Sequence, residues 1–217
     1  MSKETVIKKT TKFVKEALSG FEVGHDWWHV YRVWKSTIHI AKTENIDLFV
    51  AELGALLHDI ADSKFHSGDE SVGPRKARDF LDSLSVDVVT TDHVVKIIEN
   101  ISFKGGNHVQ KFTSPELDVV QDADRLEAIG AIGIARAFTY GGHHNDEIHN
   151  PNIKPRLGMT KKEYKKNTPT TINHFYEKLL SLKDMMNTKS GSKLANARHE
   201  YMEQFLSQFY AEWEGKK

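Results

Sequence analysis

The chain has 217 residues, of which 28% are charged and 39% hydrophobic, and its 30 basic residues balance its 30 acidic ones. This composition is that of a globular protein, and a formal net charge of zero argues against strong nucleic-acid binding or attachment to a charged membrane surface. The sequence contains no cysteine, which excludes disulfide bonds and thiolate zinc sites.

Apolar residues recur at helical spacing along nearly the whole chain, and no stretch shows the alternation of a strand. Ser114 and Pro115 form a helix start, with a cap residue followed by a proline, and the glycines at 141 and 142 form a stop after Tyr140. Thr168 and Pro169 repeat the start signal. The predicted helices span residues 3–19, 26–43, 47–58, 71–84, 87–101, 115–140, 169–187 and 190–213.

We therefore expect an all-α fold in a single domain over residues 1–217. Its helical core covers about residues 22–142, a long polar loop covers 143–168, and C-terminal helices cover 169–213. A loop of this length inside a compact domain is either a surface excursion or a lid over a binding site, and the sequence favours neither. The N-terminal stretch lacks the apolar core of a signal peptide, and no apolar run is long enough to span a bilayer. We expect a cytoplasmic location.

Four positions have side chains that resist burial unless something satisfies them. His29 falls early in the second predicted helix, His58 and Asp59 end the third, and Asp124 lies in a segment rich in Ala, Ile and Gly. Two imidazoles and two carboxylates form a mixed nitrogen and oxygen set suited to Mn, Fe, Co, Ni or Zn. Asp122 lies two residues from Asp124, and a helix would point the two side chains in different directions, so one of them is expected to be a ligand.

His25 and His29 are four residues apart and offer an alternative interpretation, because two histidines at this spacing on a helix bind zinc in metalloproteases. The sequence between them is H-D-W-W-H and lacks the glutamate of the H-E-x-x-H motif. The protease interpretation is therefore disfavoured. Trp27 and Trp28 adjoin His29, and core packing is favoured over stacking on a nucleobase for both.

Three blocks of the sequence resemble the HD-domain metal-dependent phosphohydrolases, and in particular their bacterial YpgQ/YedJ-like branch. The blocks read GHDWWHVYRVW, LLHDIADSKFH and QDADRLEAIGAIGIARAF, and they occur in the order that this family shows. The later HFYEKLLSLKDMMNT and ARHEYMEQFLSQF are similar to the same branch. The resemblance extends over about residues 3–213.

The resemblance implies that one divalent metal ion is bound by His29, His58, Asp59 and Asp124. Asp124 is preferred to Asp122 because ADRL is similar to the metal-binding aspartate segment of other HD hydrolases. The acidic residue three positions after the doublet often takes part in catalysis, and in this chain that residue is Asp62.

A phosphate substrate also needs cations to offset its charge. Lys64 lies five residues after the doublet and is the first candidate, both for binding and for catalysis. Arg32 lies one turn after His29, and Arg125 adjoins Asp124, although Arg125 is equally suited to a structural ion pair. His66 is a further candidate for substrate binding.

The resemblance to the YpgQ-like branch implies a nucleoside triphosphate pyrophosphohydrolase that releases pyrophosphate and uses manganese, with Fe, Co, Ni, Zn or Mg as alternatives. A phosphomonoesterase acting on nucleoside monophosphates is the nearest alternative activity. A non-catalytic nucleotide-sensing module is an alternative from another class. The expected partner is a nucleotide or another phosphate ester, and the apolar helical faces also allow a homodimer.

Overall fold

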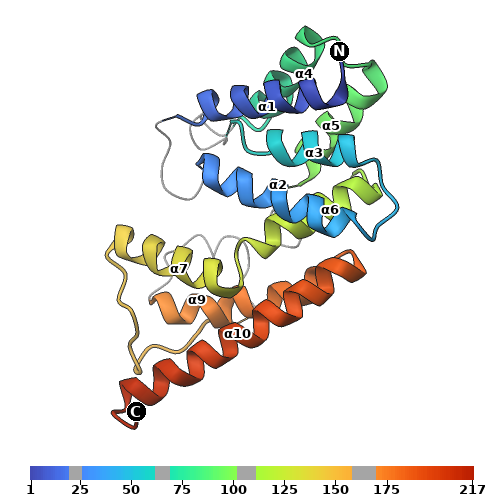
Figure 1. The fold of residues 1–217 in the computed structure, drawn as a ribbon. Coiled ribbons are helices and arrows are strands. Elements are labelled where there is room, and N and C mark those ends of the chain that lie inside the picture. Colours follow the sequence, from blue (N-terminus) through green and yellow to red (C-terminus); the bar gives the residue numbers. More distant parts are fainter. Residues whose placement is uncertain (20–25, 62–68, 102–110, 158–169) are drawn as a thin grey trace. The chain divides into compact units, whose positions relative to one another are not determined.

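The computed structural model describes residues 1–19, 26–61, 69–101, 111–157 and 170–217, and these residues form an all-α structure (Figure 1). No β-strand occurs in these ranges, where the single isolated bridge joins Glu147 to Thr170. The predicted fold class is confirmed. The elements are α1 (Lys3–Ala17), α2 (Trp27–Ala41), α3 (Leu48–Leu57), α4 (Val72–Ser83), α5 (Val88–Asn100), α6 (Pro115–Leu126), α7 (Gly130–His144), α9 (Thr171–Glu177), the 3₁₀ helix η3 (Leu179–Met185) and α10 (Lys189–Trp213).

The helices group into two compact units. The first unit holds the described residues up to Ala123, and the second holds those from Asp124 to Lys217. The expectation of a single domain over residues 1–217, with a core over 22–142, remains a prediction. No helix in the described ranges is both long enough and apolar enough to cross a membrane.

Helix α3 is the centre of the first unit and contacts α1, α2 and α5. Its sequence LFVAELGALL is apolar on nearly every side, which is the pattern of a helix surrounded by others. Gly54 faces α5 so closely that a Cβ atom at this position would lie 3.0 Å from Cγ2 of Ile97. Burial of residues 50, 51 and 53–57 fixes the position of α3, and therefore of the two residues that follow it.

The second unit is built around α10, which contacts α7 and η3. The stripe of α10 that packs inward has a spacing of three to four residues, as expected for one face of a helix, and consists of Gly191, Ala195, His199, Met202 and Leu206. Arg156 pairs through its guanidinium with the buried carboxylate of Glu177 at 3.2 Å, which fastens the chain after α7 to α9.

Two predicted helices are wrong in their extent. The helix expected from Pro115 to Tyr140 ends at Leu126, and a separate helix begins at Gly130 and runs to His144. Gly130 has a φ of +74°, which no continuous right-handed helix allows. The helix expected from residue 169 to 187 consists of α9 and η3, and α9 begins after Thr170, whose hydroxyl accepts from the backbone N–H of Asn173.

The predicted polar loop over 143–168 also differs from the structure at its start. Helix α7 includes His143 and His144 and ends at Asn145, which has a φ of +56°. The following segment is tied to α9, because the backbone N–H of Thr171 donates to the carbonyl of Glu147 at 2.9 Å. Residues 158–169 lie outside the described ranges, so the lid hypothesis stays open.

Candidate metal centre

His29, His58 and Asp59 lie together in the first unit, where each offers one ligand atom and these atoms are all within 4.8 Å of one another. His29 belongs to the first turn of α2, and His58 is the residue that ends α3. The two helices are in contact, and the start of α2 meets the end of α3. The structure brings these three predicted ligands together, and their role in metal binding remains a prediction.

The separation of the two imidazoles suits coordination of one ion. Nε2 of His29 and Nε2 of His58 are 3.2 Å apart. Two nitrogens that each lie about 2.0–2.1 Å from the same metal ion are separated by about 2.8–3.0 Å at octahedral angles and by about 3.3–3.4 Å at tetrahedral angles. Neutral imidazole nitrogens and a carboxylate oxygen are ligands that divalent transition metals accept. The donor set and its spacing therefore fit a divalent ion.

The orientation of His58 is fixed by its own helix. Nδ1 of His58 lies 2.8 Å from the carbonyl oxygen of Ala55. A carbonyl can only accept, so Nδ1 carries the proton and Nε2 of a neutral imidazole keeps its lone pair for a ligand bond. A hydrogen bond from the second ring nitrogen to a backbone carbonyl is the usual support of metal-binding histidines.

His29 is held by Asp26, which is not among the site residues predicted from the sequence. Asp26 is the N-cap of α2, and its Oδ1 accepts from the backbone N–H of His29 at 2.9 Å. The side chain of His29 is 4% exposed. An aspartate three residues before a histidine at the start of a helix is the sequence signal that could have identified Asp26.

Several predicted residues lie outside the described ranges, namely Asp62, Lys64, His66 and His25. Asp124 is the first residue of the second unit and is partly exposed, whereas Asp122 is fully buried. Arg125 donates through Nη1 to the carbonyl of Met185 at 2.5 Å, a contact that supports its alternative, structural role.

Two further residues of α2 near His29 are accessible. Arg32 is partly exposed one turn after His29, where helix geometry places the two side chains on neighbouring faces. Trp28 is 60% exposed and meets Tyr31 edge-on, with the ring centres 5.8 Å apart. The expectation of core packing for Trp28 is wrong, because this side of α2 faces solvent.

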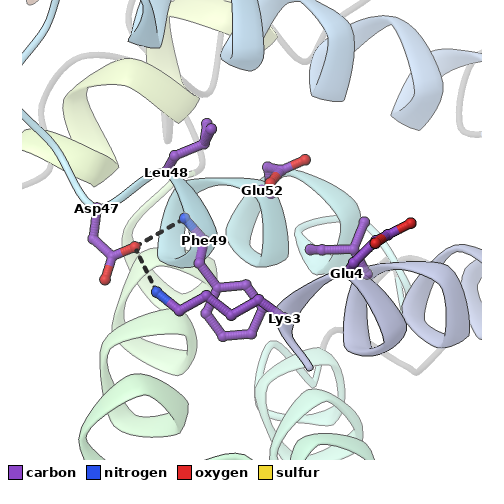
Figure 2. Close-up of a pocket in the computed structure, with 7 residues that line it drawn as sticks. Lys3, Glu4, Asp47, Leu48, Phe49 and Glu52 are labelled. Carbon is purple, nitrogen blue, oxygen red and sulfur yellow. Dashed lines mark hydrogen bonds and ion pairs between the residues drawn. The ribbon is translucent and has the colours of Figure 1, made fainter. Parts of the chain in front are cut away.

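A hollow in the first unit lies away from these residues. It has a volume of about 400 Å³ and is lined by α1 and by the start of α3 (Figure 2). Lys3 pairs with Asp47 at 3.8 Å and lies over the ring of Phe49, with its Nζ 4.9 Å from the ring centre. Helix α3 rises about 1.5 Å per residue, so its ten residues put the hollow about 15 Å from the His58–Asp59 end.

Comparison with known proteins shows which family the chain belongs to. Residues 27–129 match the HD domain. The chain is 37% identical over 197 residues to YpgQ of Bacillus subtilis, which covers 90% of this chain and 88% of YpgQ. This chain belongs to the HD family. The predicted enzyme class is confirmed, because this is a family of metal-dependent phosphohydrolases, and its domain binds divalent metal ions.

Solved structures extend the likeness to the whole chain. The crystal structure of an HD-superfamily hydrolase from Bacillus thuringiensis is 42% identical, with a TM-score of 0.80, and the match covers 98% of this chain and 99% of that one. The structure of Bacillus subtilis YpgQ in complex with ADP is 32% identical in the structural alignment, with a TM-score of 0.76, and the match covers 98% and 97%.

Proposed function

We propose that this HD hydrolase acts on nucleotides and converts nucleoside triphosphates to nucleoside monophosphates and pyrophosphate. The observation that carries the proposal is the cluster of His29, His58 and Asp59, whose donor atoms lie within 4.8 Å of one another. The ADP bound to the related YpgQ supports a nucleotide as the substrate. The pyrophosphate-releasing reaction rests on the resemblance to the YpgQ-like branch.

His29, His58 and Asp59 would hold the ion, and Asp124 would complete the set as the family pattern implies. Manganese is the proposed ion, since mixed imidazole and carboxylate ligands suit it and the family resemblance favours it. A bound divalent ion supplies positive charge that polarises a phosphoryl oxygen and lowers the pKa of a coordinated water. The protein fixes the ligand geometry, with the Nδ1 proton of His58 held by Ala55.

The remaining roles belong to residues around the doublet. Asp62 would orient the attacking water and accept its proton, as expected for a carboxylate beside the reacting phosphorus. Lys64 and Arg32 would neutralise phosphate charge that develops during the reaction. Arg125 and His66 remain proposed substrate contacts.

The reaction is tested by product analysis in ¹⁸O-labelled water. The metal-free protein is supplied with Mn²⁺ and with a panel of ribo- and deoxynucleoside mono- and triphosphates, and products are identified by phosphorus NMR. Attack at the α-phosphorus gives pyrophosphate and an ¹⁸O-labelled monophosphate. His39→Ala serves as a control variant and should retain activity, because His39 is an exposed histidine on α2 outside the cluster.

Other products would redirect the proposal. Inorganic phosphate from monophosphates alone would establish the phosphomonoesterase. Nucleotide binding without turnover, with metal bound, would favour the sensing module. Label in pyrophosphate instead of the monophosphate would place attack at the β-phosphorus and overturn the proposed scissile bond.

A further inference from the structure

The cap of α2 bonds directly to the backbone of a proposed metal ligand. Asp26 has extended backbone angles, with φ −93° and ψ 175°, and its Oδ1 lies 2.9 Å from the backbone nitrogen of His29. His29 is the third residue of α2, so it belongs to the turn that depends most on a cap. The first four N–H groups of a helix have no partner within the helix, and the first turn opens more readily than the rest.

We propose that Asp26 is a positioning residue of the metal centre, which sets metal affinity by keeping the first turn of α2 closed. The proposal rests on the proposed role of His29 as a ligand. With this turn formed, Nε2 of His29 lies 3.2 Å from Nε2 of His58. Opening of the turn moves His29 away from His58, so the fraction of molecules able to bind metal falls and the apparent affinity falls with it.

The same chain contains a matched cap that holds no ligand. Asp87 is the N-cap of α5, and its Oδ1 accepts from the backbone N–H of Thr90 at 2.9 Å, the same spacing and distance as in α2. Among the described residues, the only cluster suited to a metal is the one at His29, and no member of it lies in α5. Loss of either cap removes a comparable hydrogen bond. Only the loss of Asp26 should lower the affinity for the metal ion.

The hydrogen bond and the negative charge of Asp26 can be separated by substitution. Asp26→Asn keeps an acceptor at the same position and removes the charge. Asp26→Glu keeps the charge and moves the acceptor one methylene away from the backbone. If capping sets the affinity, Asp26→Asn should behave as the unchanged protein and Asp26→Glu should behave as Asp26→Ala.

The test is titration of metal-free protein with Mn²⁺ by calorimetry, together with the thermal midpoint of each metal-free variant. We expect Asp26→Ala and Asp26→Glu to bind Mn²⁺ about 10-fold more weakly, as for loss of a residue that supports a metal ligand. Asp26→Asn should remain within about 3-fold of the unchanged protein, as for a substitute cap of similar strength. Asp87→Ala should lower the thermal midpoint and leave the affinity unchanged.

Three results would overturn the inference. If Asp26→Ala bound Mn²⁺ as tightly as Asp87→Ala does, the cap of α2 would not affect metal affinity. Asp26→Asn as weak as Asp26→Ala would show that charge, and not capping, is responsible. If the unchanged protein bound no Mn²⁺, both this inference and the proposed function would fail. If the unchanged protein and Asp26→Ala bound Mn²⁺ equally well, this inference alone would fail.

Discussion

Nε2 of His29 and Nε2 of His58 lie 3.2 Å apart, although 29 positions separate the two residues in the sequence. Helices α2 and α3 produce this contact, because α2 begins where α3 ends. Asp59 adds a carboxylate to the two imidazoles, within 4.8 Å. Each of these residues alone is common in proteins, and their convergence is what points to a metal.

The first prediction concerns the doublet at the end of α3. His58→Ala and Asp59→Ala should each weaken Mn²⁺ binding by about 100-fold or more, since loss of even a supporting residue costs about 10- to 100-fold. Both residues are only partly buried, so the helical circular dichroism of the variants should match that of the unchanged protein. Calorimetric titration gives the affinity, and retention of activity in either variant would remove these residues from the site.

A second prediction separates the two aspartates of α6. Asp124→Asn should abolish Mn²⁺ binding at concentrations that saturate the unchanged protein, because an amide is a much weaker ligand than a carboxylate. Asp122→Asn is the control, since Asp122 is fully buried and should affect the free energy of unfolding more than metal binding. The reverse outcome, with metal lost in Asp122→Asn and kept in Asp124→Asn, would exchange their roles.

The residue types of the site could be predicted from the sequence, whereas its supporting contacts could not. Histidine and aspartate side chains at the end of an apolar helix are visible in the sequence, because burying them without a partner is costly. The hydrogen bond from His58 to the carbonyl of Ala55 depends on a rotamer and leaves no such trace. Asp26 is visible in the sequence as the start of a helix, whereas its link to the metal centre is visible only in the structure.

The helices also divide into those that the sequence predicts and those that only the structure shows. Periodicity predicts α1 to α5 and α10 to within a few residues, since apolar residues recur at helical spacing in each of them. The break between Leu126 and Gly130 is hidden, because the apolar pattern of α6 continues across it into α7. The extended backbone of Ile129 and the left-handed backbone of Gly130 separate the two helices, and a glycine in a sequence does not reveal its φ.

A third prediction uses the largely buried His174 of α9. Burial lowers the pKa of this imidazole to about 4, with Lys178 acting in the same direction and Glu177 opposing. The neutral form is therefore favoured in the folded state. Stability is fully present above the ordinary pKa of 6.5 and is lost as the pH falls from there towards 4. Between pH 7 and pH 5 the loss from this residue should be about 2 kcal/mol.

The measurement is the urea midpoint of unfolding at pH 7 and at pH 5. His174→Gln removes the titration and should reduce the difference between the two midpoints. The exposed His144, substituted in the same way, should leave the difference unchanged. An equal pH dependence in the unchanged protein and in His174→Gln would show that His174 is not responsible for the acid sensitivity.

The last prediction compares two glycines of α7. Gly130 has a φ of +74°, and a Cβ atom there would lie 2.9 Å from Cγ of Arg198. Gly130→Ala should lower the free energy of unfolding by about 1–2 kcal/mol from the left-handed backbone alone, with the displacement of Arg198 adding to it. Gly142 lies within the helix, and a Cβ atom there would have no neighbour within 4 Å.

Gly142→Ala should therefore stabilise the protein by up to about 1 kcal/mol, because alanine is the better helix former. The two substitutions add the same methyl group to the same helix, and the structure predicts opposite signs for them. Urea unfolding of both variants measures the difference. If Gly130→Ala were also neutral or stabilising, α6 and α7 would not need the left-handed turn, and the continuous helix expected from the sequence would regain support.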